Sequence, residues 1–262
     1  MTSIVIIPAR YQSTRFPGKP LSLLKGKTLI QHVYENSRGS HLIGDVIVAT
    51  DNKDIFEEVL SFGGKAVMTR EGHPSGTDRI AEVAASLNYD IIVNVQGDEP
   101  LVRPQMIDDV ISLLHDERAS IGTLMKRITE AEEVLDPNVV KVVIDEEGFA
   151  LYFSRSPIPY CRDKWKLSRR KQGAVGRDFA GTFTIRDFHC YKHIGIYSYR
   201  RETLLTLSGI EPTDLEKIEK LEQIRALEKG IRIKTKETFF ETFGVDTPED
   251  LKRVEKCLST SL

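Results

Sequence analysis

Three basic side chains lie close together in the loop that follows the first apolar run of the sequence. Arg10, Arg15 and Lys19 come after Ile4–Ile7, in a loop stiffened by two prolines and Gly18. Guanidinium and ammonium groups suit the oxygens of a polyphosphate, and backbone amides near Gly18 would add further donors. The loop therefore predicts a polyphosphate site. The alternative interpretation is a basic surface loop.

Two acidic residues are candidate ligands for a cation beside such a phosphate. Asp98 follows the apolar run Ile91–Val95, and Asp246 precedes Thr247 near the end of the chain. Mg²⁺ commonly takes one or two protein carboxylates together with phosphate oxygens and water, so Asp98 is the first candidate ligand. Asp246 is a second candidate, although an acid before Thr-Pro is equally typical of a helix start.

The segment His73–Arg79 is a further candidate because its hydroxyls and amides precede a helix, where they could bind a base or a phosphate. Ordinary capping by Thr77 explains that residue equally well. The sequence has no G-x-G-x-x-G after its first strand, and Leu21 stands where a Walker loop ending in Gly26-Lys27-Thr28 needs glycine. These two phosphate motifs are therefore excluded. His189 and His193 have no third ligand nearby, which argues against zinc.

The elements that position these residues alternate between strands and helices, as in βαβ units around a mostly parallel sheet. The predicted strands of the first half are Ile4–Ile7, Val46–Ala49, Ala66–Thr69 and Ile91–Val95. The predicted helices are Leu29–Ser37, Lys53–Phe62, Gly76–Leu87 and Pro104–His115, with Thr28 and Thr77 as start signals. The carboxyl ends of such strands are where open α/β sheets bind ligands.

After Ala119 the pattern predicts a mixed extension of the sheet. The predicted strands are Ile121–Met125, Val139–Ile144, Ala150–Ser154, Tyr191–Tyr199 and Arg232–Lys236, with a hairpin turn at Glu146-Glu147-Gly148. The predicted helices are Arg201–Leu207, Asp214–Glu228 and Pro248–Leu258, the last started by Thr247. Residues 157–187 show little periodicity, and we expect a flexible or partner-ordered segment there.

Composition excludes several classes of protein. The 262 residues are 40% hydrophobic and 29% charged, which argues against disorder, and 37 basic against 39 acidic residues lack the excess of a nucleic-acid binder. No apolar run reaches the roughly 20 residues of a membrane span, and none suits a secretory signal. The 3 cysteines form no C-x-x-C pair. We expect a cytoplasmic protein with neither nucleic acid nor membrane insertion.

Several blocks, taken in their order along the chain, carry a resemblance to a known family. They are Pro8-Ala9-Arg10 with 13–21, 73–79, 94–100, 153–159, 193–197, Leu221-Glu222-Gln223 and 244–251. Together they closely resemble the 3-deoxy-manno-octulosonate cytidylyltransferases, or CMP-Kdo synthetases. The match covers nearly the whole chain apart from 161–187.

The resemblance implies a Rossmann-like α/β/α sandwich of nucleotide-diphospho-sugar transferase type, with a mixed, mostly parallel sheet. It implies one domain over 1–262, with a smaller sugar-binding and dimerisation lobe at about 137–200, in a homodimer. The implied reaction is CTP with Kdo giving CMP-Kdo and pyrophosphate, for lipopolysaccharide synthesis in a Gram-negative type of cell.

The resemblance also assigns roles to residues. The implied catalytic residues are Arg10, Lys19, Asp98 and Asp246, of which Asp98 and Asp246 would hold Mg²⁺. A second Mg²⁺ would be bound through the CTP phosphates. The implied nucleotide-binding residues are Arg10, Arg15, Lys19, Ser75, Gly76, Thr77, Arg79, Gln96 and Asp98. The implied sugar-acid pocket consists of Arg155, His193, Tyr197, Glu222 and Gln223.

Other interpretations remain open from the residues alone. Arg155 could serve a structural ion pair. Another sugar nucleotidyltransferase would share the same loops and differ in its pocket. A metal-dependent glycosyltransferase would use Gln96-Gly97-Asp98 and release no pyrophosphate. A noncatalytic nucleotide-binding module would have no need for the pair of acids.

Overall fold

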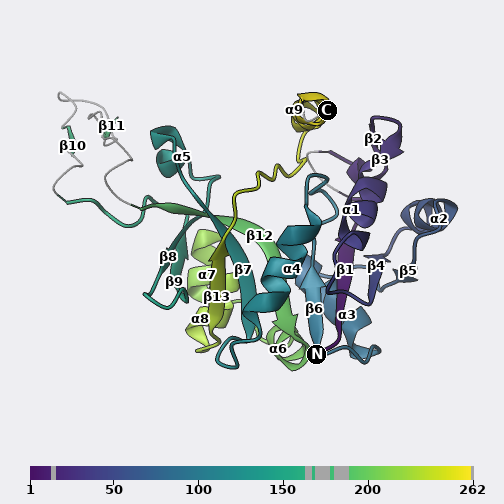
Figure 1. Ribbon diagram of the computed structural model, residues 1–262, viewed down its shortest axis with the longest axis horizontal. Coiled ribbons are helices and arrows are strands. Elements are labelled where there is room, and N and C mark those ends of the chain that lie inside the picture. The colour runs from purple at the N-terminus through teal and green to yellow at the C-terminus, as the bar shows by residue number, and fades with distance from the viewer. Residues whose placement is uncertain (13–15, 163–166, 169–177, 180–188, 261–262) are drawn as a thin grey trace.

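A mixed nine-stranded sheet lies at the centre of the protein, with helices on both faces (Figure 1). The computed structural model describes residues 1–12, 16–162, 167–168, 178–179 and 189–260. The main path of the sheet has the order β13-β7-β12-β6-β1-β4-β5. The bounds are β1 Ser3–Ala9, β4 Asp45–Thr50, β5 Ala66–Met68, β6 Ile91–Asn94, β7 Ile121–Arg127, β12 Tyr191–Arg200 and β13 Ile233–Glu237. The predicted α/β fold is confirmed.

Two apolar cores form because β1 buries both of its faces. Val5 and Ile7 belong to one core, and Ile4 and Ile6 belong to the other, as the alternation of side chains along a strand requires. The first core includes α1 Leu29–Arg38, α2 Lys53–Ser61 and α4 Pro104–Leu113. The second includes α3 Gly76–Ala85, α6 Arg201–Ser208 and α8 Gln223–Glu228. The three layers fix β1 and β6 rigidly.

The predicted mixed extension is also confirmed. β12 pairs antiparallel with both β6 and β7, whereas β13 pairs parallel with β7. β8 Lys141–Ile144 and β9 Ala150–Ser154 form a hairpin whose turn contains Gly148, with a φ of 81°. The short strands β10 Leu167–Ser168 and β11 Asp178–Phe179 pair antiparallel. Most of 157–187 that was expected to be flexible lies outside the described residues.

The start of α3 differs from its prediction. Ser75, and not Thr77, is the N-cap, because its Oγ accepts a hydrogen bond of 3.2 Å from the Asp78 N–H. Thr77 is buried within the first turn, where its hydroxyl donates to the Glu222 carboxyl. For α1 the predicted start is confirmed, since Thr28 accepts a hydrogen bond from the Gln31 N–H.

The single helix predicted for Asp214–Glu228 is wrong, because the chain breaks it into α7 Asp214–Glu219 and α8. Lys220 adopts a left-handed backbone with φ 55° and ψ 46°, which ends α7. Apolar spacing continues across the break, so the sequence pattern could not reveal it. The turn brings Arg225 back onto Glu216, and the two side chains form a buried ion pair with N–O distances of 2.6 and 2.7 Å.

A small apolar cluster attaches the end of the chain to the sheet edge. Val245 and Val254, from the last loop and from α9 Pro248–Thr260, pack with Leu24 and Leu29. Leu24 belongs to the hairpin of β2 Leu23–Leu24 and β3 Lys27–Thr28, which follows the 3₁₀ turn η1 Lys19–Leu21. In Figure 1, α9 accordingly lies near β2, β3 and the upper end of α1. The cluster holds residues from both ends of the chain at one place.

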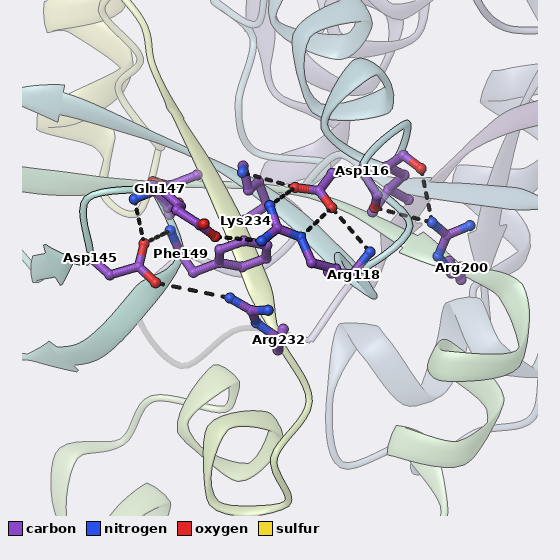
Figure 2. A network of polar contacts seen from close by, with 11 residues as sticks. Asp116, Arg118, Asp145, Glu147, Phe149, Arg200, Arg232 and Lys234 are labelled. Atoms are coloured by element: carbon purple, nitrogen blue, oxygen red, sulfur yellow. Dashed lines mark hydrogen bonds and ion pairs between the residues drawn. The ribbon is translucent and has the colours of Figure 1, made fainter.

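A network of charged side chains supports the opposite edge of the sheet (Figure 2). The cationic groups of Arg118, Arg232 and Lys234 lie 5.3, 3.6 and 4.3 Å from the centre of the Phe149 ring. Asp116 accepts hydrogen bonds from Arg118 and Lys234. These bonds hold the pKa of the Asp116 carboxyl below its usual range. The network joins the β8–β9 turn to β13, away from the ends of β1 and β6.

The short helix α5 Ala131–Leu135 precedes β8. None of the helices described by the structure is long and apolar enough to cross a membrane.

We expect Arg225→Met to lower the free energy of unfolding by about 3–5 kcal/mol, because it leaves the buried Glu216 carboxylate without its partner. The two side chains are 7% and 11% exposed. Urea unfolding followed by circular dichroism measures the change. Lys53→Met is the matched control, since Lys53 forms an exposed i,i+4 pair with Glu57 that contributes about 0.5 kcal/mol or less. Similar losses in the two variants would contradict a dominant role for the buried pair.

Candidate active site

Two acidic loops meet at the carboxyl end of β6. Asp98 lies in the turn that follows β6, and the Val245 N–H donates a hydrogen bond of 2.9 Å to the Asp98 carbonyl oxygen. This backbone bond places Asp246 next to Asp98, although the two are far apart in the sequence. The apolar cluster around Val245 keeps the second loop in position. The fold therefore brings the two acids together, and their role as metal ligands stays a prediction.

Lys19 lies between the two carboxylates. Its ammonium contacts Asp98 Oδ2 and lies 3.1 Å from Asp246 Oδ1. The backbone positions this side chain because Gly18, with a φ of 69°, turns the loop into η1. Gly18 also donates its N–H to the Tyr11 carbonyl oxygen at 2.9 Å. The first-strand loop and the two acids thus converge on one point.

The carboxyl groups here change the acidity of their neighbours. Burial tends to lower the pKa of Lys19, but the charges of Asp98 and Asp246, and their hydrogen bonds, raise it overall. Burial, and then the negative charges of the same two acids, raise the pKa of the Glu99 carboxyl to about 8. Among the described residues, Glu99 Oε2 is buried without a hydrogen-bond partner. The carboxyl groups of Asp98, Asp246 and Glu99 thus lie close to the Lys19 ammonium.

A cavity of about 810 Å³ opens beside this cluster. Its lining includes the charged side chains Arg10, Lys19, Asp98 and Asp246. The rest of the wall comes from Pro8, Ala9, Tyr11, Gln12, Pro17, Pro20, His73, Pro74, Ser75, Gly76, Arg79, Gln96 and Gly97. A cavity of this size suits a small organic ligand. The predicted residue Arg15 lies outside the described residues.

Most of the predicted nucleotide residues line this cavity, but Arg79 is already bound to protein groups. Its guanidinium donates to Asp51 Oδ2 at 2.6 Å and to the Thr69 hydroxyl. Thr77 is not among the lining residues. His73, the first residue of the candidate segment His73–Arg79, also lines the wall, and its Nε2 contacts the Glu82 carboxylate.

The predicted sugar-acid residues form a second group next to the cavity. The His193 ring lies 5.3 Å from that of Tyr197 and 5.1 Å from that of Phe153. Burial lowers the pKa of His193 to about 3 and raises that of Tyr197 well above its usual value. These side chains are thus neutral at physiological pH.

Two contacts connect this second group to the cavity wall. Glu222 accepts hydrogen bonds from the hydroxyls of Thr77 and Ser75, and burial raises its pKa. Tyr197 lies opposite Asn94 in the sheet, and Asn94 accepts a hydrogen bond of 3.1 Å from the Gln96 side chain. Gln223 is buried at the start of α8. None of the five predicted sugar-acid residues lines the 810 Å³ cavity itself.

Arg155 has a different environment from the other four. Its guanidinium donates to the carbonyl oxygens of Glu219 and Pro137 at 2.8 and 2.9 Å. Its backbone N–H donates to the Glu219 carboxylate at 2.9 Å. The side chain therefore holds the loop before β8 against the end of α7. Its contact with a substrate carboxylate stays a prediction.

Asp98 and Asp246 suit a divalent cation by their chemistry and placement. Their oxygens converge on one ammonium, which stands in for a compact cation. In the described part of the chain, no group of three or more His, Cys, Asp or Glu side chains could hold a metal. A metal at this place would need further oxygens from substrate and water, which is how Mg²⁺ is commonly bound.

The fold and the site together define a class of enzyme. A cavity at the carboxyl ends of β1 and β6, with cations for phosphates and two acids for a metal, is typical of nucleotidyltransferases. The model of the Cytidylyltransferase family matches residues 4–255. Among curated relatives, the 3-deoxy-manno-octulosonate cytidylyltransferase of Thermodesulfovibrio yellowstonii is 51% identical over 99% of both chains. That of Geobacter metallireducens is 52% identical over 99% of this chain and 98% of its own. The chain belongs to the 3-deoxy-manno-octulosonate cytidylyltransferase family.

Solved structures agree with this assignment. The structure of a CMP:2-keto-3-deoxy-manno-octonic acid synthetase complexed with CTP matches with a TM-score of 0.88 and 40% identity, covering 100% of both chains. A cytidylyltransferase from Leptospira borgpetersenii matches with a TM-score of 0.62 and 18% identity, covering 100% of this chain and 88% of its own. The second likeness concerns the fold alone.

We expect Gly18→Ala to weaken CTP binding more than Gly26→Ala does. Both glycines have positive φ, so each substitution strains the backbone by about 1–2 kcal/mol. An added Cβ at Gly18 would also lie 3.2 Å from the Tyr11 ring in the cavity wall, whereas Gly26 has open space. Calorimetric titration with CTP measures the difference. Equal affinities in the two variants would show that the Tyr11 contact does not matter.

Proposed function

We propose that the protein transfers CMP from CTP to the 2-hydroxyl of Kdo, forming CMP-Kdo and pyrophosphate for lipopolysaccharide synthesis. The observation that carries this proposal is the convergence of Asp98, Asp246 and Lys19 in the wall of the cavity. Positioning and stabilisation of phosphate charge are what nucleotidyl transfer requires, and two acids with a cation beside a ligand-sized cavity can supply them. Family membership supports the choice of CTP and Kdo.

The basic residues that line the cavity bind and orient the triphosphate. Arg10 and Lys19 neutralise the phosphates, and Arg15 is proposed to join them. As the Kdo oxygen bonds to the α-phosphorus, the bond to the β-phosphate oxygen breaks and charge grows on pyrophosphate, which the same cations stabilise. The proton of the attacking hydroxyl passes to solvent.

Asp98 and Asp246 are proposed to hold Mg²⁺. When bound, the ion would supply positive charge that lowers the pKa of the attacking hydroxyl and neutralises charge on the α-phosphate. The carboxylates fix where nucleophile and phosphorus meet, because each occupies a loop held by the backbone bond between Val245 and Asp98. A second Mg²⁺ is proposed to bind through the CTP phosphates.

The remaining wall of the cavity is proposed to bind the nucleoside. Ser75, Gly76, Gln96 and Arg79 line this part, and Thr77 supports it from the first turn of α3. The neighbouring group of His193, Tyr197, Glu222 and Gln223 is proposed to bind the Kdo hydroxyls. The hydrogen bonds of Glu222 with Ser75 and Thr77, and the position of Tyr197 opposite Asn94 in the sheet, support this placement. Arg155 is the proposed cation for the Kdo carboxylate.

We further propose that the protein is a cytoplasmic homodimer that forms one domain over 1–262, with a smaller sugar-binding and dimerisation lobe at about 137–200. Two apolar side chains of that lobe, Leu151 and Tyr160, are exposed. In Figure 1, β10 and β11 lie apart from the main sheet. Both features support a partner surface on this part of the chain.

A pyrophosphate-release assay with CTP, Kdo and Mg²⁺ tests the proposed reaction. We expect turnover by the natural sequence and a loss of roughly 100-fold for Asp98→Asn or Asp246→Asn, because an amide ligates Mg²⁺ poorly and carries no charge. Lys27→Ala is the control, since Lys27 pairs with Glu35 on the surface.

The outcomes of this assay separate the rival functions. Turnover with another ulosonic acid, or with a sugar 1-phosphate, in place of Kdo would indicate a different sugar nucleotidyltransferase. A glycosyltransferase would release no pyrophosphate, and a binding module would show no turnover with any acceptor. Full activity of either Asp variant at limiting Mg²⁺ would contradict the shared metal site.

We expect Arg155→Ala to impair turnover with Kdo by roughly 2–4 kcal/mol in transition-state terms, the usual cost of losing one partner of a desolvated charge pair. CTP affinity should change little. Steady-state kinetics with varied Kdo, together with thermal unfolding, measure both roles of this residue. Lower thermal stability with an unchanged KM for Kdo would restrict Arg155 to its bonds with the Glu219 and Pro137 carbonyls.

A further inference from the structure

The Lys19 ammonium has the coordination that a small cation would have at this site. It contacts one oxygen of Asp98 and one of Asp246, and the Lys19 side chain is only 14% exposed. Asp98 and Asp246 are 27% and 45% exposed, so solvent reaches the carboxylates from the cavity side. In this state the protein supplies its own positive charge to the pair of acids.

The backbone of Lys19 is fixed, whereas its side chain is held mainly by charge. The Lys19 N–H donates to the Phe16 carbonyl oxygen, and the Lys19 carbonyl oxygen accepts from the Ser22 N–H at 3.0 Å. Buried Pro20 follows directly. The side chain itself is a flexible four-carbon stem ending in a compact charge. The ammonium can therefore leave the acids without any change in the loop.

The same ammonium cannot serve the carboxylates and a phosphate chain at once. A divalent cation bound to Asp98 and Asp246 would occupy the space where Nζ lies and would repel it. Lys19 also lines the cavity together with Arg10, where phosphates are proposed to bind. Phosphates offer the ammonium an alternative set of negative oxygens within reach of its stem.

We propose that Lys19 is an internal counter-ion that excludes a divalent cation from Asp98 and Asp246 until a bound nucleotide triphosphate draws its ammonium away. The inference rests on the proposed metal site and adds the order in which nucleotide and metal bind. Nucleotide binds first, and the two carboxylates then become available to the metal. Before that, the metal affinity of the pair is reduced by the fraction of molecules in which Lys19 is withdrawn.

This order of binding keeps the negative charges of Asp98 and Asp246 balanced at each stage. Two adjacent carboxylates without a cation repel one another. Lys19 neutralises the pair while the cavity is empty. When its ammonium moves to the phosphates, it leaves a site that binds a metal strongly only in the presence of substrate.

The test measures Mn²⁺ binding to the full-length protein without CTP or Kdo, from the loss of the free-ion signal in electron paramagnetic resonance. We expect Lys19→Met to bind Mn²⁺ roughly tenfold more tightly than the natural sequence, as removal of a competing internal ligand requires. Lys19→Gln should behave likewise, and circular dichroism should show that both variants are folded. Asp246→Asn in the Lys19→Met background should cancel the gain.

Arg10→Met is the matched control, since it removes one positive charge from the same cavity by deleting an exposed side chain. A gain in Mn²⁺ affinity as large as that of Lys19→Met would show that only the general potential had changed, and would overturn the proposal. Unchanged affinity in both Lys19 variants would also overturn it. Because no nucleotide or sugar is present, this result is independent of the pyrophosphate assay on which the proposed function depends.

Discussion

The site depends on two carboxylates that are held next to each other by the backbone. Asp98 and Asp246 would repel if they met only through their side chains, and exposed loops would separate them. The bond from the Val245 N–H to the Asp98 carbonyl oxygen fixes the loops instead, and Val245 itself is buried in the apolar cluster with Leu24 and Leu29. Apolar burial of the loops thus holds the two carboxylates together against their mutual repulsion. A positive charge between the acids then balances their negative charges. Lys19 supplies that charge, so the first loop of the chain, the turn after β6 and the last loop become one unit.

The sheet makes this meeting possible because its parallel strands end at a single edge. β1 lies between β6 and β4, and its two buried faces hold it in the middle of both cores. The loops after β1 and β6 therefore begin next to each other, which is the general position of ligand sites in open α/β sheets. The antiparallel strand β12 adds something that a purely parallel sheet would lack. It runs back alongside β6, so Tyr197 lies opposite Asn94 and a second group of polar side chains reaches the same edge.

The sequence predicted those features that depend on neighbours along the chain. Short β-branched runs indicated β1, β4 and β6, because such strands must be apolar on both faces. Features that depend on distant contacts could not be predicted in this way. Nothing near Asp246 distinguishes a helix start from a ligand, and its pairing with Lys19 appears only in the folded chain. The sequence predicted Thr77 as the start of α3, whereas Ser75 is the N-cap and the Thr77 hydroxyl donates to Glu222. The family resemblance placed Arg155 near a sugar acid, but its bonds to carbonyl oxygens come from a break at Lys220 that apolar spacing conceals.

The polar side chains of the site differ in how firmly they are held, and the difference matches what each must do. Arg79 is fixed by Asp51, and His73 by Glu82, so the wall that must recognise a substrate keeps its shape in advance. Arg10 is exposed, and Lys19 is retained mainly by the charges of its partners. Phosphoryl transfer moves negative charge from the substrate onto a departing pyrophosphate, so cations that can follow the charge are useful there. The fixed side chains of the wall can therefore select the substrate before the reaction, and the movable cations can follow the negative charge while the reaction proceeds.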